Sequence, residues 1–193
     1  DPIEAHAPKL AAVRGALLGD DPVSVILTGT AGDGKTYHIR RFFFDDVRGA
    51  DEDWPGDEGV LGAMLPSGRP LRIIRDLSQL TDAAKAEEIG HVTRCLLGED
   101  TETLYLVAAN DGQLLKFWRD AMEAAGTSVA ERERFGDVLA ALTDMLRRDR
   151  DRDEAGRLRV AMLNLSRTAT EETLDRVFDG ILEHPAWAHG CDA

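Results

Sequence analysis

The chain has 193 residues, of which 43% are apolar and 31% charged, and its formal net charge at neutral pH is -13. This length suits one domain with a sizeable core, or one domain with a small appendage. The acidic balance argues against binding of nucleic acid or of an acidic membrane through bulk electrostatics. The sequence has neither an apolar run long enough to cross a bilayer nor a signal peptide at its start, so we expect a cytoplasmic protein without membrane contact.

The first predicted elements lead into a glycine-rich loop. Apolar residues at helical spacing predict a helix over 8–18, and a short strand is expected at 23–27. This strand runs directly into Gly-Thr-Ala-Gly-Asp-Gly-Lys-Thr at 29–36, and a helix is expected from 35 to about 45. The order of glycines, lysine and threonine is a complete P-loop (Walker A) pattern, in the required context of a strand before it and a helix after it.

The chemistry of phosphate binding explains this spacing. Glycines let the backbone curl so that its N–H groups point at phosphate oxygens, and the helix adds its positive N-terminal end. Lys35 is expected to reach the β- and γ-phosphates, and Thr36 to bind a Mg²⁺ ion that bridges them. Because backbone N–H groups form the cradle, we expect the Asp33 side chain to face water. The predicted nucleotide-binding residues are Gly29, Thr30, Ala31, Gly32, Asp33, Gly34, Lys35, Thr36 and Tyr37.

The middle of the chain supplies two further strand candidates with polar ends. Residues 49–70 are rich in Asp, Glu, Gly and Pro and predict a long loop with room for one short strand. A strand is expected at 71–76, where it ends in Asp76, and a helix at 81–97. The most continuous apolar stretch, 104–109, predicts a strand buried on both faces, followed by Asn110 and Asp111.

The last third of the chain is mainly helical. Helices are expected at 113–124 and 129–147, the second strongly amphipathic. Residues 147–159 alternate in charge, which predicts a solvated helix end and turn, with a mobile arginine lid as the alternative. A strand at 158–165 precedes Ser166 and Arg167, and a capping box at 168–171 predicts a final helix.

These elements predict how the chain divides into units. We expect a nucleotide-binding core over 1–167 and a C-terminal helix and tail over 168–193 that continues into a further domain. Because the sequence begins with Asp1 and not with Met, we expect it to be part of a longer protein. His184, His189 and Cys191 do not complete a tetrahedral zinc site by themselves.

Strands that alternate with helices after the loop predict an α/β fold, a three-layer sandwich with a mainly parallel sheet. In such sheets ligands bind at the carboxyl ends of the strands. Asp76 and Asp111 both meet this condition and are the candidate Mg²⁺ ligands alongside Thr36. We assign the metal to Asp76, because Asn110 stands where the carboxylate after the better buried strand is expected, and we give Asn110 a sensing role near the γ-phosphate.

The order of a P-loop, an acid-ended strand and then Leu-Val-Ala-Ala-Asn at 106–110 resembles ATPases of the AAA+ and related STAND-like class. In that class a strand-end asparagine, sensor 1, orients the attacking water, and Asn110 matches it. Arg167 matches the position of an arginine that faces a nucleotide in the same or a neighbouring subunit; a surface arginine at a helix start is the alternative. The resemblance implies ATP and Mg²⁺ as cofactors, and hydrolysis that involves Lys35, Asn110 and Arg167.

More narrowly, Gly-Thr-Ala-Gly-Asp-Gly-Lys-Thr, Ala-Ala-Asn-Asp-Gly-Gln-Leu and Leu-Asn-Leu-Ser-Arg resemble motifs of ATPase subunits in bacterial anti-phage defence, such as the phosphorothioation-dependent restriction systems. This implies an ATP-binding and ATP-hydrolysing domain that powers or switches a larger assembly, such as a DNA-targeting defence complex. The implied partners are other subunits or domains of that complex, or further copies of this chain.

The sequence departs from this class at one position. The Asp-Glu pair of a standard Walker B motif is replaced by Asp76-Leu77 or by Asn110-Asp111. Because that Glu polarises the attacking water in such ATPases, a nucleotide-sensing module without turnover is one alternative. A small-molecule P-loop kinase, with 147–159 as its lid, is another. A GTPase is disfavoured because the sequence has no Asn-Lys-x-Asp motif.

Overall fold

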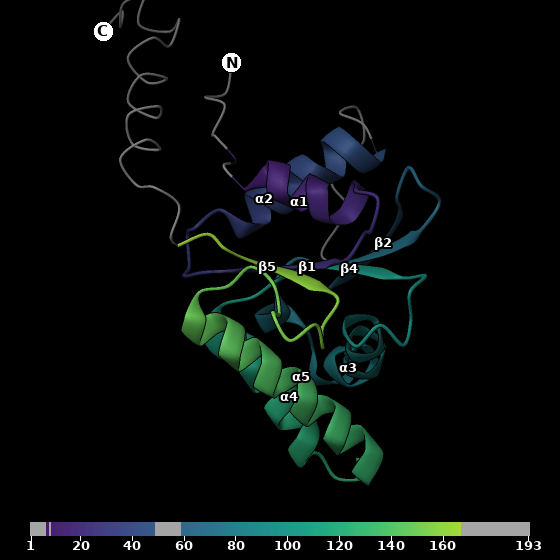
Figure 1. Ribbon diagram of the computed structural model, residues 1–193, viewed down its shortest axis with the longest axis vertical. Helices are drawn as coiled ribbons and strands as arrows, with labels where there is room; N and C mark the ends of the chain where they lie inside the picture. Colours follow the sequence, from purple (N-terminus) through teal and green to yellow (C-terminus); the bar gives the residue numbers. More distant parts are fainter. Residues whose placement is uncertain (1–6, 8, 49–58, 167–193) are drawn as a thin grey trace, which may run out of the picture.

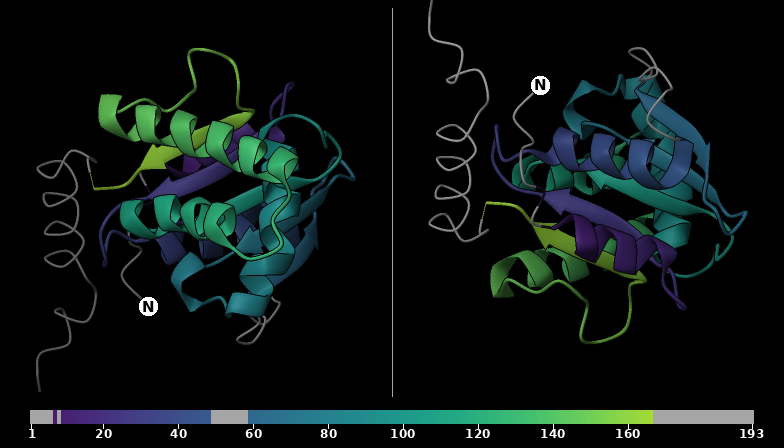
Figure 2. Two further views of the ribbon diagram at one scale, coloured as in Figure 1. Left: turned by 90° about the horizontal axis from the view of Figure 1, so that it is seen from below. Right: turned by 90° about the horizontal axis from the view of Figure 1, so that it is seen from above.

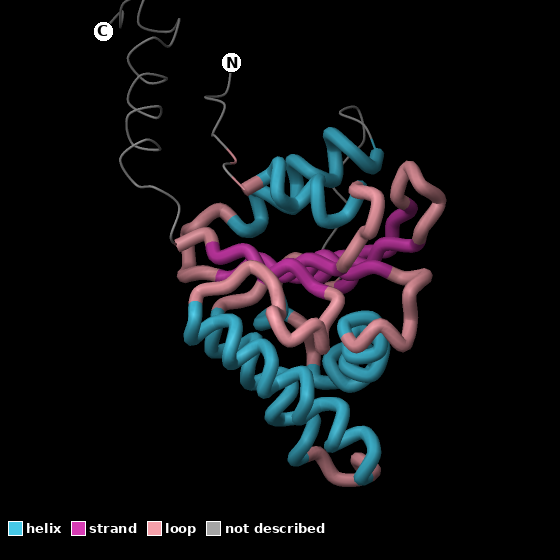
Figure 3. Tube along the Cα trace, viewed as in Figure 1, coloured by secondary structure: helices cyan, strands magenta, loops and turns pink. Residues whose placement is uncertain are grey.

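The computed structural model describes residues 7, 9–48 and 59–166, and shows a central sheet between two layers of helices (Figures 1 and 3). This confirms the predicted α/β class with a mainly parallel sheet. Arg167 and the segment 168–193 lie outside the described residues, as do the three residues weighed as zinc ligands. None of the described helices is both long and apolar enough to span a membrane. The helical elements are α1 (Leu10–Leu18), α2 (Lys35–Phe42), η1 (Phe43–Arg48), η2 (Leu77–Gln79), α3 (Asp82–Leu96), α4 (Asp111–Glu123) and α5 (Val129–Arg148).

The sheet has five strands in the order β2-β3-β4-β1-β5. Four of them are parallel, and β2 pairs with β3 in the antiparallel direction. The carboxyl ends of the four parallel strands therefore lie at one edge of the sheet, as Figure 2 shows. The strands are β1 (Ser24–Thr28), β2 (Val60–Met64), β3 (Pro70–Ile74), β4 (Leu104–Ala108) and β5 (Val160–Asn164).

Two apolar cores hold the layers together, one on each face of the sheet. Helices α1 and α2 cover one face and enclose the first core, and α3, α4 and α5 cover the other and enclose the second core (Figure 1). Along β1, Val25 and Leu27 pack toward α1 and α2, whereas Ile26 packs toward the other three helices. All residues of β1 and β4 are buried. Burial on both faces is why these two strands read as continuous apolar runs in the sequence.

The segment 49–70 contains the short strand for which the prediction left room. Strand β2 forms a hairpin with β3, in which Val60 lies opposite Ile74 and Met64 opposite Pro70. Leu61 on β2 is buried, whereas Gly62 is exposed. This edge strand has only a weak apolar pattern because Gly62 and Met64 are exposed and Val60 is only partly buried. Residues 49–58 lie outside the described part of the chain.

The helix that follows the glycine-rich loop changes its winding after two turns. It is α-helical as far as Phe42 and continues as the π-helix η1, a difference from the uniform helix to about residue 45 that we predicted. Arg14 of α1 pairs with Asp45 at 3.0 Å and with Asp46 at 2.7 Å, which joins α1 to η1. The π-helical turn brings both carboxylates to the same arginine.

A polar cluster joins α3 to the sheet inside the second core. Glu88 of α3 is only 2% exposed and pairs with Arg72 of β3, whose Nε lies 3.0 Å from Oε2 of Glu88. The hydroxyl of the fully buried Tyr105 donates to the same Oε2 at 2.8 Å. Because each buried polar group has a partner, this cluster fixes α3 against β3 and β4.

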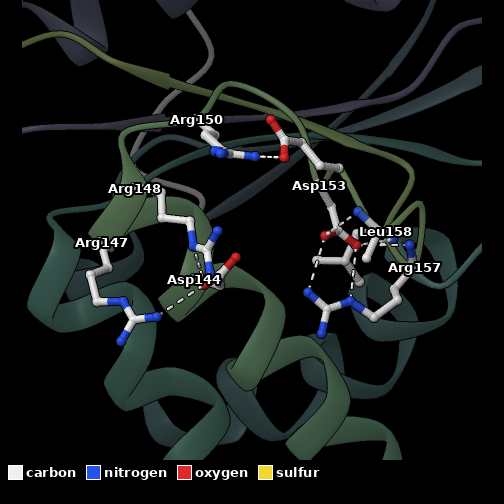
Figure 4. Close-up of polar contacts among 9 residues, drawn as sticks. Asp144, Arg147, Arg148, Arg150, Asp153, Arg157 and Leu158 are labelled. Carbon is white, nitrogen blue, oxygen red and sulfur yellow. Dashed lines mark hydrogen bonds and ion pairs between the residues drawn. The ribbon is translucent and has the colours of Figure 1, made fainter.

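The charged segment 147–159 forms ion pairs within itself and with the preceding turn of α5 (Figure 4), and its last residue, Arg159, pairs with Asp21. Arg147 and Arg148 both pair with Asp144, one turn back on α5, Arg150 pairs with Glu154, and Arg157 pairs with Asp153. The segment then runs beside β5, where the N–H of Met162 donates to the carbonyl of Asp151 at 2.9 Å. These contacts favour the solvated helix end and turn over an arginine lid.

Candidate functional site

The residues that the sequence singled out lie at the carboxyl edge of the sheet. The glycine-rich loop, residues 29–34, follows β1, Asp76 follows β3, and Asn110 follows β4. Strand β1 lies between β4 and β5, so the loop has the ends of both strands beside it. Two backbone hydrogen bonds continue the pairing past the strand ends, from Ala109 to the carbonyl of Leu27 at 3.1 Å and from Leu165 to that of Thr28 at 2.9 Å.

The chain leaves β1 and β4 toward opposite faces of the sheet. Strand β1 continues into α2 on one face, and β4 into α4 on the other, as the views in Figures 1 and 2 show. Adjacent parallel strands whose helices diverge in this way leave a crevice between their carboxyl ends, the place where α/β sheets bind ligands. In this protein the glycine-rich loop and Asn110 flank that position.

The backbone of the loop needs its glycines. Gly29, Gly32 and Gly34 have φ angles of 136°, 90° and 80°. Residues other than glycine are strained at such positive φ angles. A Cβ atom at Gly29 would in addition lie only 2.6 Å from a carboxylate oxygen of Asp33. The sequence pattern therefore matches the conformation that the loop adopts.

Lys35, the first residue of α2, reaches back over the loop. Its Nζ donates to the carbonyl oxygens of Gly29 at 3.0 Å and of Thr30 at 2.6 Å. The start of the helix is fixed by His38, whose N–H and ring Nδ1 both lie 2.9 Å from the carbonyl oxygen of Gly34. The loop thus carries an ammonium group held close to its own backbone.

Asp33 does not simply face water, and that expectation was wrong. Its Oδ2 accepts hydrogen bonds from the backbone N–H of Thr30, from the Thr30 hydroxyl at 2.9 Å and from the Ser166 hydroxyl at 2.5 Å. The bond from Ser166 is the main cause that lowers the pKa of Asp33 below its usual value. The prediction considered the loop by itself. In the structure the carboxylate of Asp33 accepts hydrogen bonds from Thr30 of the same loop and from Ser166.

Ser166 is a site residue that the sequence analysis missed. It stands two residues after β5, and its hydroxyl also accepts a hydrogen bond from the N–H of Thr30 at 3.0 Å. Its own backbone N–H donates to Oδ1 of Asn164 at 3.0 Å. The signals in the sequence were its place after a buried strand and its occurrence in Leu-Asn-Leu-Ser-Arg, but the pairing of β5 with β1 is what brings it to the loop.

Two of the three polar strand-end residues, Asn110 and Asp76, cap the helices that follow them. Oδ1 of Asn110 accepts from the N–H of Gln113 at 2.8 Å and caps α4, of which Asp111 is the exposed first residue. Oδ1 of Asp76 accepts from the N–H and hydroxyl of Ser78, at 2.8 and 2.7 Å, and caps η2. Because β4 separates β3 from β1, Asp76 follows a strand about 10 Å from the loop strand, and Asp111 one about 5 Å away.

Across residues 7, 9–48 and 59–166, no three His, Cys, Asp or Glu side chains gather closely enough to hold a metal ion alone. Mg²⁺ in phosphate-binding sites is commonly held by one or two protein oxygens, with phosphates and water as the other ligands. The exposed Thr36 at the start of α2, together with Asp76 or Asp111 at the same sheet edge, offers a donor set of this kind.

One polar atom beside the loop stands out by its burial. The hydroxyl of Thr28, the last residue of β1, is fully buried and has no hydrogen-bond partner among the described residues. Thr28 lies opposite Asn164 in the sheet register and directly precedes Gly29. An unsatisfied buried hydroxyl costs about 1–3 kcal/mol, which makes such groups uncommon in native proteins.

Two concave regions are lined by residues outside the glycine-rich loop. A groove of about 600 Å³ runs between α3, α4 and α5, with Ile89, Phe117 and Phe135 among its lining residues. A smaller one of about 150 Å³ is lined by Arg75, Asp76 and the start of α3. Comparison of the chain with models of protein families, with curated proteins and with solved structures gave no match.

Proposed function

We propose that this chain binds ATP with Mg²⁺ at the carboxyl edge of its sheet and hydrolyses it slowly. The observation that carries the proposal is the position of the glycine-rich loop. The loop and Lys35 lie where β1 and β4 diverge, with Asn110 at the end of the neighbouring strand. The left-handed conformations of Gly29, Gly32 and Gly34 are what a backbone needs to turn its N–H groups inward on a phosphate.

Each residue of the site has a proposed role. Backbone N–H groups of the loop and the ammonium of Lys35 position the phosphates, after Lys35 exchanges its contacts with the loop carbonyls for phosphate oxygens. Thr36 and Asp76 would hold Mg²⁺, which would supply neutralisation of the phosphate charge, and Asp111 is the alternative acid. The amide of Asn110 orients the attacking water, and Arg167 contacts the nucleotide in its own or a neighbouring subunit.

A nucleotide sensor without turnover is the second candidate, and one observation favours it. The residue after Asp76 is Leu77, whose side chain is 2% exposed and packs into the second core. The position at which the resembled ATPases carry a water-polarising Glu is therefore occupied by a buried apolar group. This is why we propose slow hydrolysis that rises when the chain joins its assembly.

The biological setting is proposed from the motif resemblance described above. We propose that the chain is one part of a larger assembly, either with other subunits or with further copies of itself, and that the nucleotide powers or switches it. A DNA-targeting defence complex is the setting that the resemblance suggests. In such a complex partner domains would contact the DNA, because this chain is strongly acidic.

Calorimetric titration with MgATP, with phosphate release measured in the same samples, tests the proposal. Wild type is compared with Lys35→Ala and with Lys116→Ala, a control that removes an exposed lysine paired with Asp120 on α4. We expect binding and slow release in wild type and in the control, and loss of both in Lys35→Ala. Binding without release would favour the sensor. Absence of binding in wild type would refute the proposal, and phosphate transfer to an added small acceptor would point to a kinase.

A further inference from the structure

We propose that Asp33 is a built-in competitor of the nucleotide: its carboxylate occupies donors of the phosphate loop, Ser166 holds it there, and nucleotide binding breaks this Asp33–Ser166 contact. The inference rests on the proposed function. It adds a residue that sets nucleotide affinity and a residue that links the loop to the end of β5, neither of which follows from the P-loop pattern.

The first step is the identity of the donors that Asp33 uses. One carboxylate oxygen accepts from the N–H of Thr30 and from two hydroxyl groups. Backbone N–H groups of a glycine-rich loop are the donors that a phosphate oxygen requires, and the N–H of Thr30 is one of those of this loop. A carboxylate and a phosphate are both anionic oxygen acceptors, so they compete for the same N–H and repel each other when close.

The second step is that the loop is held as a unit. While Asp33 is bound to Thr30, the ammonium of Lys35 is bound to the carbonyl oxygens of Gly29 and Thr30. The Oδ2 atom of Asp33 also lies so near Gly29 that a Cβ atom there would approach it to 2.6 Å. An incoming phosphate group must therefore displace the carboxylate of Asp33 and redirect Lys35 together.

The third step concerns Ser166. Its backbone N–H is fixed to the side chain of Asn164, and the preceding residue, Leu165, is hydrogen-bonded to Thr28. Only the hydroxyl has to rotate when Asp33 leaves. Because Ser166 directly precedes Arg167 in the sequence, loss of the Asp33–Ser166 contact changes the restraint on the point where the chain leaves the sheet.

Affinity measurements on a mutant cycle test this inference. MgATP is titrated into wild type, Asp33→Ala, Ser166→Ala and the double variant, with Asp20→Ala as a control that removes an equal charge from an exposed position before β1. We expect Asp33→Ala to bind about tenfold more tightly, which is about 1.4 kcal/mol. Ser166→Ala should bind a few-fold more tightly. The double variant should match Asp33→Ala, and the control should match wild type.

Several results would overturn the inference. Unchanged or weaker binding by Asp33→Ala would show that the carboxylate does not compete. Equal tightening by Asp20→Ala would show that only net charge matters, and additive effects of the two substitutions would show that Ser166 does not act through Asp33. The free energies of unfolding of the same four proteins, measured without nucleotide, check the Asp33–Ser166 contact separately. If these free energies show coupling but wild type and all variants fail to bind ATP, the proposed function fails and this inference with it.

Discussion

The backbone N–H of Gln113 donates a hydrogen bond to Oδ1 of Asn110 over 2.8 Å. The residue proposed to orient the attacking water is therefore also the N-cap of α4. A cap of this kind contributes about 1 kcal/mol to stability. Loss of activity in a simple alanine variant would mix the two roles, and the substitutions must be chosen to separate them.

The variants Asn110→Asp and Asn110→Ala separate the capping role of Asn110 from its proposed role in catalysis. Asp caps a helix about as well as Asn, so we expect unchanged stability for Asn110→Asp and a loss of about 1 kcal/mol for Asn110→Ala. ATP hydrolysis should fall at least tenfold in both, because neither side chain keeps the amide N–H. Urea unfolding and phosphate release measure the two effects. Full turnover in Asn110→Asp would remove the proposed role in catalysis.

Neutral substitutions decide which acid supports the metal. Asp76→Asn is expected to lower the Mg²⁺-dependent part of ATP affinity about tenfold. Asp111→Asn should leave that affinity unchanged and cost about 0.3–1 kcal/mol of stability, because Asp111 is a favourable charge in the first turn of α4. Titrations with ATP in the presence of Mg²⁺ and of EDTA measure the difference. The reverse pattern would move the metal role to Asp111.

The polar cluster in the second core predicts a stability effect without loss of nucleotide binding. Tyr105→Phe removes the 2.8 Å hydrogen bond to Glu88, while Arg72 continues to satisfy that carboxylate. We expect a loss of about 1 kcal/mol in the free energy of unfolding, measured with urea. Glu88→Ala should cost about 3 kcal/mol or more, since it leaves the buried Tyr105 hydroxyl and Arg72 without their partner. Equal effects would contradict this description.

The contribution of Asp153 should depend on pH. Its carboxylate, 3% exposed, accepts from the backbone N–H groups of Ala155, Arg157 and Leu158. Its hydrogen bond with the Arg157 side chain is the largest cause that lowers its pKa in the folded protein. A lowered pKa means that the stabilisation is complete above the unfolded value, about 3.9, and is lost as the pH falls through the folded value.

Comparison of wild type with Asp153→Asn at two pH values measures this contribution. At about pH 7 the variant should be less stable by about 1–2 kcal/mol, because an amide cannot accept all of these hydrogen bonds. At about pH 3 the gap should narrow, as protonation weakens the same contacts in wild type. A gap of constant size across this range would show that the charge of Asp153 is not what stabilises the turn.

The strands that could be predicted from the sequence are those buried on both faces. The runs of β1 and β4 are continuous and apolar, and each is followed by the loop or by polar residues that mark its end. Strand β2 could be predicted only as an option, because a partly exposed edge strand carries a weak apolar pattern. Its pairing with β3 comes from tertiary contacts that periodicity does not encode.

The same distinction applies to the candidate site. The loop glycines, Lys35 and Asn110 could be named because their spacing reflects local chemistry. Ser166 could not, since it reaches Thr30 only through the strand order that places β5 beside β1. The position of the Asp33 side chain was mispredicted for the same reason, because one of its partners is 133 residues away.

The passage of 147–159 beside β5 has a consequence for the outer edge of the sheet. Strand β5 ends the sheet on that side, and open strand edges are templates on which other chains add by backbone pairing. The carbonyl of Asp151 accepts a hydrogen bond from the N–H of Met162. The neighbouring residues of the segment 147–159 carry many charges of both signs. A second sheet that approaches this edge meets an occupied donor and a highly hydrated strip, so the segment protects the protein against edge-to-edge aggregation.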